Sequence, residues 1–298
     1  MKAIRIHAYG HSDQIHIEEA ESPAVGSHDV LLRIRDAGVN PVDWKIREGV
    51  LRDFLPTTLP LTLGQDVAGE IVELGTEVFG FRVGDPVFGF ASGAYAEYAA
   101  AKASEIALKP RRLDFDESAA LPTAALTAWQ LVMDFAKLVE GQSVLIHGAA
   151  GGVGGFAVQL ARWRGARVIA TASRRDADYL QSLGVERVID YKTEEFENFV
   201  RGADAVIDLV GGDTLDRSYA VVKEGGVIVS TVGPADGVRA RAMMMRRDGE
   251  QLARLADLVD QNILRPRVDQ ILPLTDAAIA QDLSQTGRTN GKIVLHVA

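Results

Sequence analysis

The chain contains no cysteine. This absence excludes disulfide bonds, thiolate zinc sites and a cysteine nucleophile. Positive charge is also in short supply, because 32 lysines and arginines stand against 41 aspartates and glutamates and leave a formal net charge of -9. Nucleic acids and anionic membrane surfaces bind clustered positive charge, so neither is expected as a partner.

Long apolar runs are missing as well. No uninterrupted run could span a bilayer, and the opening stretch MKAIRIHAYG alternates as a strand does, without the apolar segment of a signal peptide. We therefore expect a cytoplasmic protein.

What the chain does have is enough apolar material for a large core. Its 298 residues are 47% hydrophobic and 24% charged, as in globular proteins, and this length is comfortable for two domains. Residues 1 to about 115 predict short strands between turns, and Gly69 predicts a kink that suits a curved, barrel-like sheet. The expected strands are 2–7, 15–19, 29–37, 66–75, 87–90 and 95–99.

The pattern changes after Pro110, where helices are predicted at 118–132 and 135–139. Strands and helices then alternate, which predicts a parallel sheet with helices on both faces. The expected strands are 144–147, 167–171, 187–190, 205–209 and 227–232, and the helices between them are 156–162, 177–183, 196–200 and 214–222. A helix at 250–259 and a strand, helix and strand at 268–272, 276–285 and 292–297 complete the chain.

The stretch VLIHGAAGGVGGFAVQLA, from Val144 to Ala161, predicts a buried strand, a glycine-rich turn and a helix that starts near Gly152. The N–H groups at such a helix start can hold a pyrophosphate. Gly151 would let the backbone approach the phosphates, and Gly154 would let the helix pack on the strand. Glycine turns also join strands to helices for structural reasons alone. We expect a dinucleotide site formed by Gly151, Gly152, Val153 and Gly154.

Ligands of parallel sheets bind at the carboxyl ends of the strands. That rule nominates Ser173, Tyr191, Val210, Gly211, Val232 and Gly233.

The residues after the second strand of the alternating part indicate which dinucleotide binds. An NAD site usually has an acid here, but the run Ser173-Arg174-Arg175 offers a hydroxyl and two guanidinium groups before Asp176. Arginine matches phosphate oxygens with paired hydrogen bonds. The pattern favours the 2′-phosphate of NADPH, although a solvated helix start would also carry arginines.

The segment VRARAMMM, Val238 to Met245, predicts a last strand at the sheet edge. Arg239 and Arg241 could blunt that edge. A second copy of the chain could instead pair with it, and we expect this homodimer.

Several motifs in order resemble the medium-chain dehydrogenase/reductase superfamily, in particular its zinc-free quinone oxidoreductase branch. The resemblance covers essentially the whole chain. Its markers are Ala37-Gly38-Val39-Asn40-Pro41-Val42-Asp43, Leu63-Gly64-Gln65-Asp66-Val67-Ala68-Gly69, Gly93-Ala94-Tyr95-Ala96-Glu97-Tyr98, Leu121-Pro122 with Leu126-Thr127-Ala128-Trp129, the glycine-rich turn, and Gly291-Lys292-Ile293-Val294-Leu295.

The resemblance implies an α/β fold with a GroES-like β-barrel domain, followed by a Rossmann domain with a doubly wound parallel sheet. The first domain would span residues 1–115, with 266–298 returning to it. Residues 116–265 would form the NADP-binding domain. The active site would lie in the cleft between the two domains.

The chain departs from the zinc-dependent members of the resembled family. Those members have a cysteine where Asn40 stands and a His-Glu pair where Gln65-Asp66 stand. The cysteine-rich lobe that holds a structural zinc is missing near residues 89–95, and the six histidines are interpreted as surface or core residues. We therefore expect no metal.

Without a metal, side chains or backbone must stabilise the negative charge that develops on the acceptor oxygen. The resemblance places Asn40, Asp43 and Lys45 at the active site. Asn40 could donate from its amide, Lys45 could stabilise the oxyanion, and Asp43 could orient Lys45 or a ribose hydroxyl. An Asn-Pro turn and a solvated lysine are the alternative.

Other side chains complete the expected site. Thr127 is a candidate contact to the nicotinamide, and Tyr191 is similar in position to a family residue near the adenosine. Trp44, Phe54 and Met244 could line an apolar pocket, or simply belong to the core.

The resulting hypothesis is an NADPH-dependent oxidoreductase that transfers a hydride to a quinone or an α,β-unsaturated carbonyl. One alternative is an enoyl reductase that acts on a free enoyl substrate. A second is a non-enzymatic NADPH-binding protein with a structural or regulatory role.

Overall fold

The computed structural model describes residues 1–233 and 240–298. The chain divides into two compact units. The first comprises Met1–Thr123, Arg247–Gln261 and Pro266–Ala298, and the second comprises Ala124–Arg246 and Asn262–Arg265. No helix among the described residues is both long and apolar enough to cross a bilayer.

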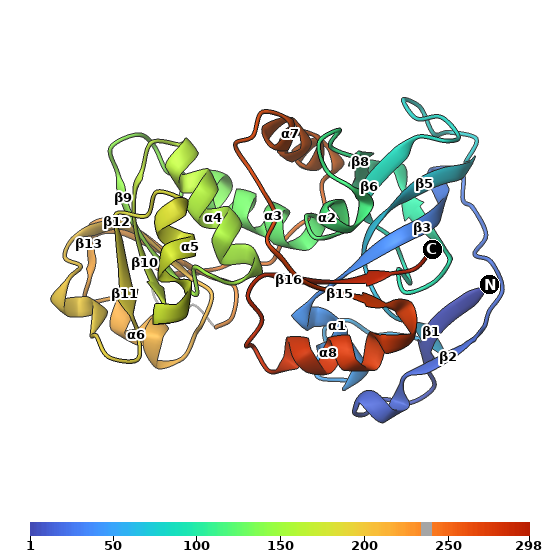
Figure 1. Ribbon diagram of the computed structural model, residues 1–298, viewed down its shortest axis with the longest axis horizontal. Helices are drawn as coiled ribbons and strands as arrows, with labels where there is room; N and C mark the ends of the chain where they lie inside the picture. The colour runs from blue at the N-terminus through green and yellow to red at the C-terminus, as the bar shows by residue number, and fades with distance from the viewer. Residues whose placement is uncertain (234–239) are drawn as a thin grey trace. The chain divides into compact units, whose positions relative to one another are not determined.

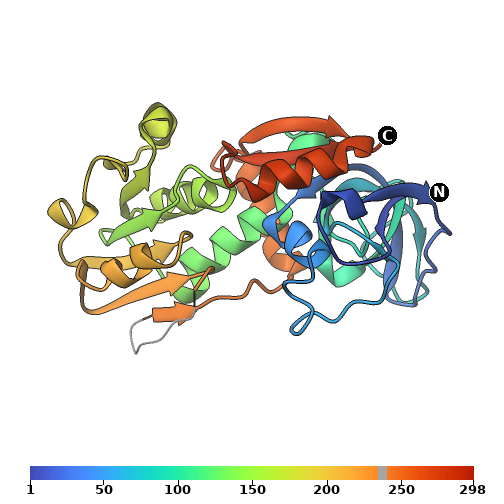
Figure 2. The same cartoon turned by 90° about the horizontal axis from the view of Figure 1, so that it is seen from below.

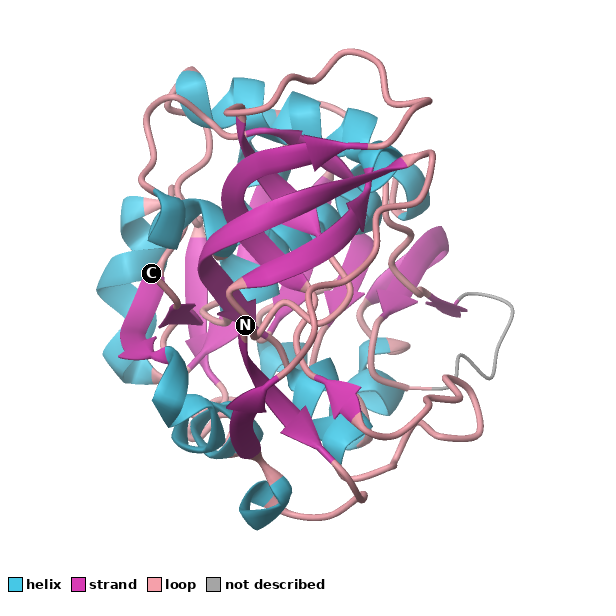
Figure 3. Ribbon diagram, turned by 90° about the vertical axis from the view of Figure 1, so that its right-hand side faces the viewer, coloured by secondary structure: helices cyan, strands magenta, loops and turns pink. Residues whose placement is uncertain are grey.

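The first unit is built on strongly curved sheets, whose strands are magenta in Figure 3. The larger sheet has the order β15-β16-β3-β5-β6-β8, with β7 paired to β3, and the smaller has the order β2-β1-β4. Gly69 lies where the pairing of β3 with β5 shifts register, and an added Cβ would lie 3.1 Å from the Ile34 Cα. The strands are β1 Lys2–Ile6, β2 His16–Glu19, β3 Asp29–Val39, β4 Leu61–Thr62, β5 Asp66–Leu74, β6 Pro86–Phe90, β7 Tyr98–Lys102, β8 Ile106–Leu108, β15 Val268–Pro273 and β16 Lys292–His296.

Four helices belong mainly to this unit: α1 Pro41–Arg47, α2 Phe115–Ala119, α7 Gly249–Asp260 and α8 Ala277–Gln285. Buried Arg47 ties α1 to α8, because its guanidinium donates to the Gln281 Oε1 at 3.2 Å and to the Gly10 carbonyl at 3.2 Å. The start of α7 lies so close to β8 that a Cβ on Gly249 would be 2.7 Å from the Ile106 carbonyl oxygen. This close packing explains why α7 belongs to the first unit. The sequence predicted the residues of α7 to lie in the second domain, 116–265.

The second unit is a six-stranded parallel sheet in the order β11-β10-β9-β12-β13-β14, shown in green to orange in Figures 1 and 2. The order reverses at β9, so right-handed crossovers put α4 and α5 on one face and α6 on the other. This is the predicted doubly wound arrangement. The strands are β9 Ser143–His147, β10 Arg167–Ala172, β11 Arg187–Asp190, β12 Ala203–Asp208, β13 Val222–Ser230 and β14 Ala240–Ala242. The helices are α3 Pro122–Trp129, whose first two residues belong to the first unit, α4 Gly152–Trp163, α5 Ala177–Ser182 and α6 Asp213–Ser218.

Some predicted helices are wrong. The helix expected at 118–132 is interrupted, because Pro122 disfavours helical backbone at Leu121 and opens the new helix α3. A π-helix, Gln130–Phe135, then follows in place of regular helix. The helix expected at 135–139 does not form, and Lys137 has a left-handed φ of 51°.

Four further boundaries differ. Residues 196–200 form only a 3₁₀ turn, Phe196–Asn198, and α6 ends at Ser218 because β13 already begins at Val222. The strand expected at 95–99 starts at Tyr98. The last strand of the parallel sheet lies at its edge as predicted, although β14 ends at Ala242, and Val238 and Arg239 lie outside the described residues.

Candidate functional site

The glycine-rich loop of the second unit joins β9 to α4. Gly148 turns the chain with a φ of 68°, and the Gly151 N–H donates to the Gly148 carbonyl at 3.1 Å. The helix begins at Gly152, as the sequence predicts, with Gly151 as its N-cap. The first N–H groups of a helix have no partner within it, so those of α4 can donate hydrogen bonds to an anionic ligand.

The glycines of this loop differ in what surrounds them. A Cβ on Gly154 would lie 2.7 Å from the Ala149 Cα, so the helix packs on the loop only because this residue has no side chain. A Cβ on Gly151 would meet one atom, the Gly148 carbonyl oxygen at 3.3 Å. The fold therefore requires Gly154, whereas at Gly151 it leaves room for close approach of a ligand.

The loops after β9, β12 and β13 meet at the carboxyl edge of the sheet. A Cβ on Gly148 would lie 3.4 Å from the Val210 Cγ2, and a Cβ on Gly211 would lie 3.5 Å from the Val232 Cβ. Val210 and Val232 are both exposed there. Gly233 is half-buried, and a Cβ added to it would lie 3.0 Å from the Leu215 Cδ2. The structure thus brings these nominated residues together.

Asp208, which the sequence did not nominate, holds this edge in place. Its buried carboxylate accepts from the N–H groups of Val210 at 3.2 Å and Gly211 at 3.1 Å, and from the Ser230 hydroxyl at 2.8 Å. Its position as the last residue of β12, at the carboxyl end of a parallel strand, could have nominated it from the sequence.

The Ser-Arg-Arg cluster after β10 is partly used internally. The buried Asp176 carboxylate accepts from the Ser173 hydroxyl at 2.8 Å and from the Arg175 Nε at 3.3 Å. Arg174 is exposed. Tyr191 is also exposed and directly follows β11, whereas Thr127 is buried on α3.

In the first unit, Asn40 and Asp43 stand at the start of α1, a helix that the sequence did not predict. The Asn40 N–H donates to the Asp43 Oδ2 at 2.8 Å, and the Tyr95 hydroxyl donates to the same oxygen at 2.8 Å. Asp43 is 1% exposed. Burial raises the pKa of Asp43 to about 7. The hydrogen bonds from the Asn40 N–H and the Tyr95 hydroxyl lower this pKa, but their effect is smaller than that of burial. Asp43 thus contacts the helix start and Tyr95, whereas the sequence suggested that it orients Lys45 or a ribose hydroxyl.

A different lysine contacts Asn40. Lys292, the first residue of β16, donates from its Nζ to the Val39 carbonyl at 2.8 Å and to the Asn40 Oδ1. The Asp66 Oδ2 lies 3.9 Å from the same ammonium. Asp66 in turn accepts from the N–H of Thr123 at 3.0 Å. Sequence reasoning missed Lys292, Asp66, Tyr95 and Thr123 as parts of this cluster, although the first three lie in motifs that carried the resemblance.

Lys45 follows Asp43 on α1 but forms no ion pair with it among the described residues. The half-buried Lys45 places its Nζ 5.6 Å from the centre of the Trp44 ring, and no hydrogen bond in the described chain joins it to Asn40 or Asp43. Phe54 and Met244 are 80% and 85% exposed, so neither is buried in the core of its own unit.

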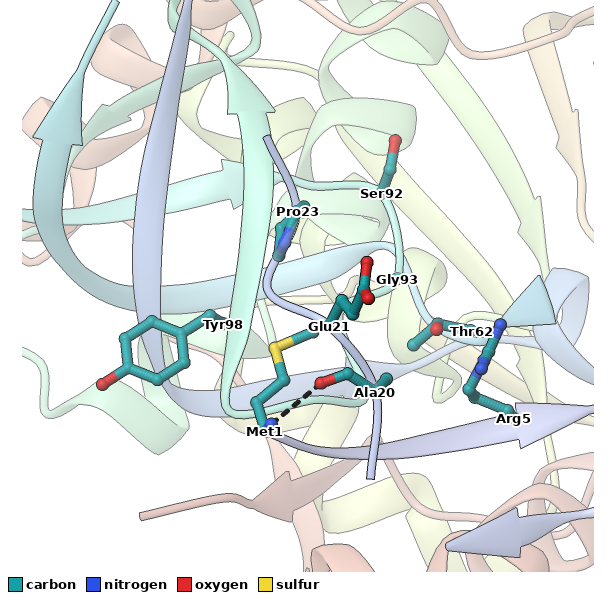
Figure 4. Close-up of a pocket in the computed structure, with 9 residues that line it drawn as sticks. All are labelled: Met1, Arg5, Ala20, Glu21, Pro23, Thr62, Ser92, Gly93 and Tyr98. Atoms are coloured by element: carbon teal, nitrogen blue, oxygen red, sulfur yellow. Dashed lines mark hydrogen bonds between the residues drawn. The ribbon is translucent and has the colours of Figure 1, made fainter. Parts of the chain in front are cut away.

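A hollow of about 340 Å³ in the first unit contains none of the predicted site residues (Figure 4). The amino group of Met1 donates across it to the Ala20 carbonyl at 2.8 Å. Its one arginine, Arg5, is held by Glu18 at 2.9 Å and by the Pro60 carbonyl at 3.2 Å. The hollow is therefore not a candidate for the chemistry.

Comparison with known proteins identifies the family. Residues 26–111 match the alcohol dehydrogenase GroES-like domain, and residues 183–295 match a family described as zinc-binding dehydrogenase. The 2-methylene-furan-3-one reductase of Solanum lycopersicum is 35% identical over 99% of this chain and 79% of its own length. The chain belongs to the medium-chain dehydrogenase/reductase superfamily.

Two further members of this superfamily are similar over the whole chain. The chloroplastic NADPH-dependent alkenal/one oxidoreductase of Arabidopsis thaliana is 32% identical over 99% of this chain and 79% of its own length. The solved quinone oxidoreductase from Coxiella burnetii is 36% identical, with a TM-score of 0.92 over 100% of this chain and 99% of that chain. The family and the two-part fold predicted from the motifs are thereby confirmed.

Protein cations contact the positions at which zinc-dependent members of the superfamily carry metal ligands. Lys292 contacts Asn40, and Arg247 donates to the Gln65 Oε1. Among residues 1–233 and 240–298, no three His, Cys, Asp or Glu side chains are grouped so that they could hold a metal ion. The groups at these positions are the amides of Asn40 and Gln65 and the carboxylate of Asp66, and each lies next to an ammonium or guanidinium group.

Proposed function

We propose that this protein is a zinc-independent, NADPH-dependent oxidoreductase that reduces quinones or α,β-unsaturated carbonyl compounds. The observation that carries the proposal is the loop at the start of α4, where Gly151 is open and the first helical N–H groups lack helix partners. These features fit a pyrophosphate. The names of the relatives, which mention NADPH, an alkenal or enone and a quinone, support the same assignment over the two alternatives.

The second unit supplies the residues that would hold the cofactor. Gly151, Gly152, Val153 and Gly154 would hold the pyrophosphate, and exposed Arg174 would bind the 2′-phosphate, with Ser173 and Arg175 held beside it by Asp176. Tyr191 would pack near the adenosine. The carboxyl-edge residues and Thr127 would lie along the rest of the cofactor: Val210, Gly211, Val232 and Gly233.

When bound, NADPH would supply a hydride, and the chain must then stabilise negative charge on the acceptor oxygen. We assign Asn40 as the hydrogen-bond donor to that oxygen, because its Nδ2 is buried without a partner among the described residues. Lys45 remains a second candidate donor. Asp43 would position Asn40 through the helix start.

We also propose a cytoplasmic homodimer. The edge position of β14 and the exposure of Met244 beside it support pairing with a second copy of the chain. The cytoplasmic location rests on the sequence alone.

The test is an absorbance assay of nicotinamide oxidation by chelator-treated protein. NADPH and NADH would each be offered with quinones, 2-alkenals, enones and simple aldehydes. We expect NADPH to be oxidised by quinones or enones but not by simple aldehydes, at a rate that the chelator does not change. Loss of activity on chelation would refute zinc independence, and silence with every acceptor would refute the reductase assignment.

A further inference from the structure

The buried cation Lys292 lies next to Asn40 for reasons of backbone geometry. β16 pairs with β3 in a register that sets Ile293 opposite Val39, so the residue before Ile293 lies beside the residue after Val39. The Lys292 N–H donates to the Arg267 carbonyl at 2.8 Å. Gly291 has a φ of 129°, and a Cβ there would lie 2.9 Å from the Arg267 carbonyl carbon. The chain therefore holds Lys292 at one place.

The contacts of Lys292 fix the orientation of the Asn40 amide. An ammonium group has three donors and no acceptor, so the Asn40 atom that faces it must be the oxygen, Oδ1. A flipped amide would place two donors against each other. The Nδ2 group is consequently turned away from Lys292.

The Nδ2 group of Asn40 has no hydrogen-bond partner among the described residues, although Asn40 is only 2% exposed. A buried donor without an acceptor is costly, which points to a ligand that supplies the acceptor. Donation from Lys292 to Oδ1 also polarises the amide and makes its N–H groups stronger donors.

We propose that Lys292 is a positioning residue for Asn40: it locks the amide so that Nδ2 donates to the substrate oxygen that becomes negatively charged. This inference rests on the function proposed above. In the reduction of an enone, the hydride that NADPH would supply adds to the β-carbon, the C=C electron pair forms a new double bond to the carbonyl carbon, and the C=O electron pair moves onto the oxygen. The resulting enolate then takes a proton from water at its α-carbon. Lys292 itself neither touches the substrate nor gives up its proton.

The ion pair with Asp66 explains how a cation is kept in this place. Lys292 is 5% exposed and Asp66 is fully buried. Burial lowers the pKa of Lys292, and the charges of Asp66 and Asp43 oppose that shift. Asp66 on β5 and Asp43 on α1 thus act against the loss of charge that burial favours.

The experiment is a double-mutant cycle on the full chain with NADPH and an enone. Asn40→Asp keeps a partner for Lys292 but replaces the Nδ2 donor by an oxygen, and we expect kcat to fall about 10²- to 10³-fold. Lys292→Met should lower kcat at least about tenfold without a change in the KM for NADPH. In an Asn40→Ala background, Lys292→Met should cause no further loss of kcat. The matched control is Lys102→Met, which removes an exposed lysine whose Nζ lies 3.7 Å from the Glu105 Oε1.

A second readout needs no turnover. 4-Nitrophenol, whose phenolate mimics the enolate oxygen and has its own absorbance, would be titrated onto the NADP⁺-loaded protein. Wild type should bind the phenolate at least about tenfold more tightly than Asn40→Asp or Lys292→Met. This readout separates a failure of the inference from a failure of the proposed function, which the turnover of wild type tests by itself.

Unchanged kcat and phenolate binding in Lys292→Met would overturn the proposal. Additive losses in the cycle would also overturn it, because Lys292 would then act independently of Asn40. If Lys292→Met fails to fold, Lys292→Met combined with Asp66→Asn removes both buried charges and takes its place, with the same expected losses.

Discussion

At the scale of single residues, the buried carboxyl of Asp43 makes stability depend on pH. Its pKa is raised to about 7 in the folded chain, whereas an exposed aspartate has a pKa of about 3.9. The folded state therefore holds this proton more tightly than the unfolded state, and the stabilisation it gives is complete below pH 4 and is lost as the pH rises to 7.

The variant Asp43→Asn isolates this effect. An asparagine oxygen can still accept from the Asn40 N–H and the Tyr95 hydroxyl but does not ionise. From pH 4 to pH 8, the unfolding free energy of wild type should fall relative to that of the variant by up to about 4 kcal/mol. Urea unfolding of both proteins across this range measures the difference. Parallel curves would contradict the raised pKa.

Comparing two proteins is necessary because other groups titrate in the same range. Burial lowers the pKa of His147 to about 4, so protonation of His147 destabilises the fold as the pH falls from 6.5. That effect has the opposite sign to the effect of Asp43. It is common to wild type and variant and cancels in their difference.

Residue patterns could nominate some site residues and not others. Gly151 and Asn40 stand in local motifs, so their positions can be inferred from neighbours in the sequence. Lys292 reaches Asn40 only because β16 pairs with β3, a register between residues about 250 positions apart that no local pattern encodes. The sequence places Asp176 only after the two arginines and gives it no role. Its hydrogen bonds with Ser173 and Arg175 depend on a 3₁₀ turn, Arg174–Asp176, that the sequence did not predict.

At the scale of elements, the start of α4 permits a matched pair of variants. Gly151→Val should abolish NADPH binding and leave the melting temperature almost unchanged, because its φ of -74° suits any residue and its Cβ meets one atom. Gly154→Val should lower the melting temperature strongly, because its Cβ would clash with the loop backbone. Thermal unfolding and cofactor titration measure both. Retained NADPH binding in Gly151→Val would show that the phosphates bind elsewhere.

The turn after β10 tests the choice of cofactor. Replacing Arg174 and Arg175 by Ala should weaken NADPH at least about tenfold and leave NADH nearly unchanged, because only NADPH carries the 2′-phosphate. Arg174→Ala alone should cause most of the loss, since Asp176 holds the Nε of Arg175. Fluorescence titration of both cofactors checks this, with exposed Arg201→Ala as control. Equal losses for the two cofactors would mean that the arginines do not bind the 2′-phosphate.

Elements with a strong repeating pattern were predictable, and short ones were not. The strands β9 to β12 and the helices α4, α7 and α8 lie within a few residues of their predicted positions. Helix α1 was missed because Asn40-Pro41 was interpreted as a possible turn, although a proline at the first helical position and an acid at the third are helix-start signals. The π-helix after Trp129 has no sequence pattern that distinguishes it from regular helix.

At the scale of the whole molecule, the order of the motifs identified the superfamily, which the relatives and solved structures confirm. The cysteine-free composition and the amides at Asn40 and Gln65 are the basis for a reaction that does not use zinc. The roles assigned to Asn40 and Lys292 depend on this zinc-independent reaction.

The most direct test is a single-turnover measurement with NADPH that carries deuterium at C4 of the nicotinamide. Chelator-treated protein would be mixed with NADPH labelled on one face or the other and with a quinone or enone, and the loss of absorbance would be followed. We predict that one of the two labels slows the reaction and the other does not, with or without chelator. Absence of oxidation in the metal-free protein, or equal rates with both labels and with unlabelled NADPH, would contradict direct hydride transfer without zinc.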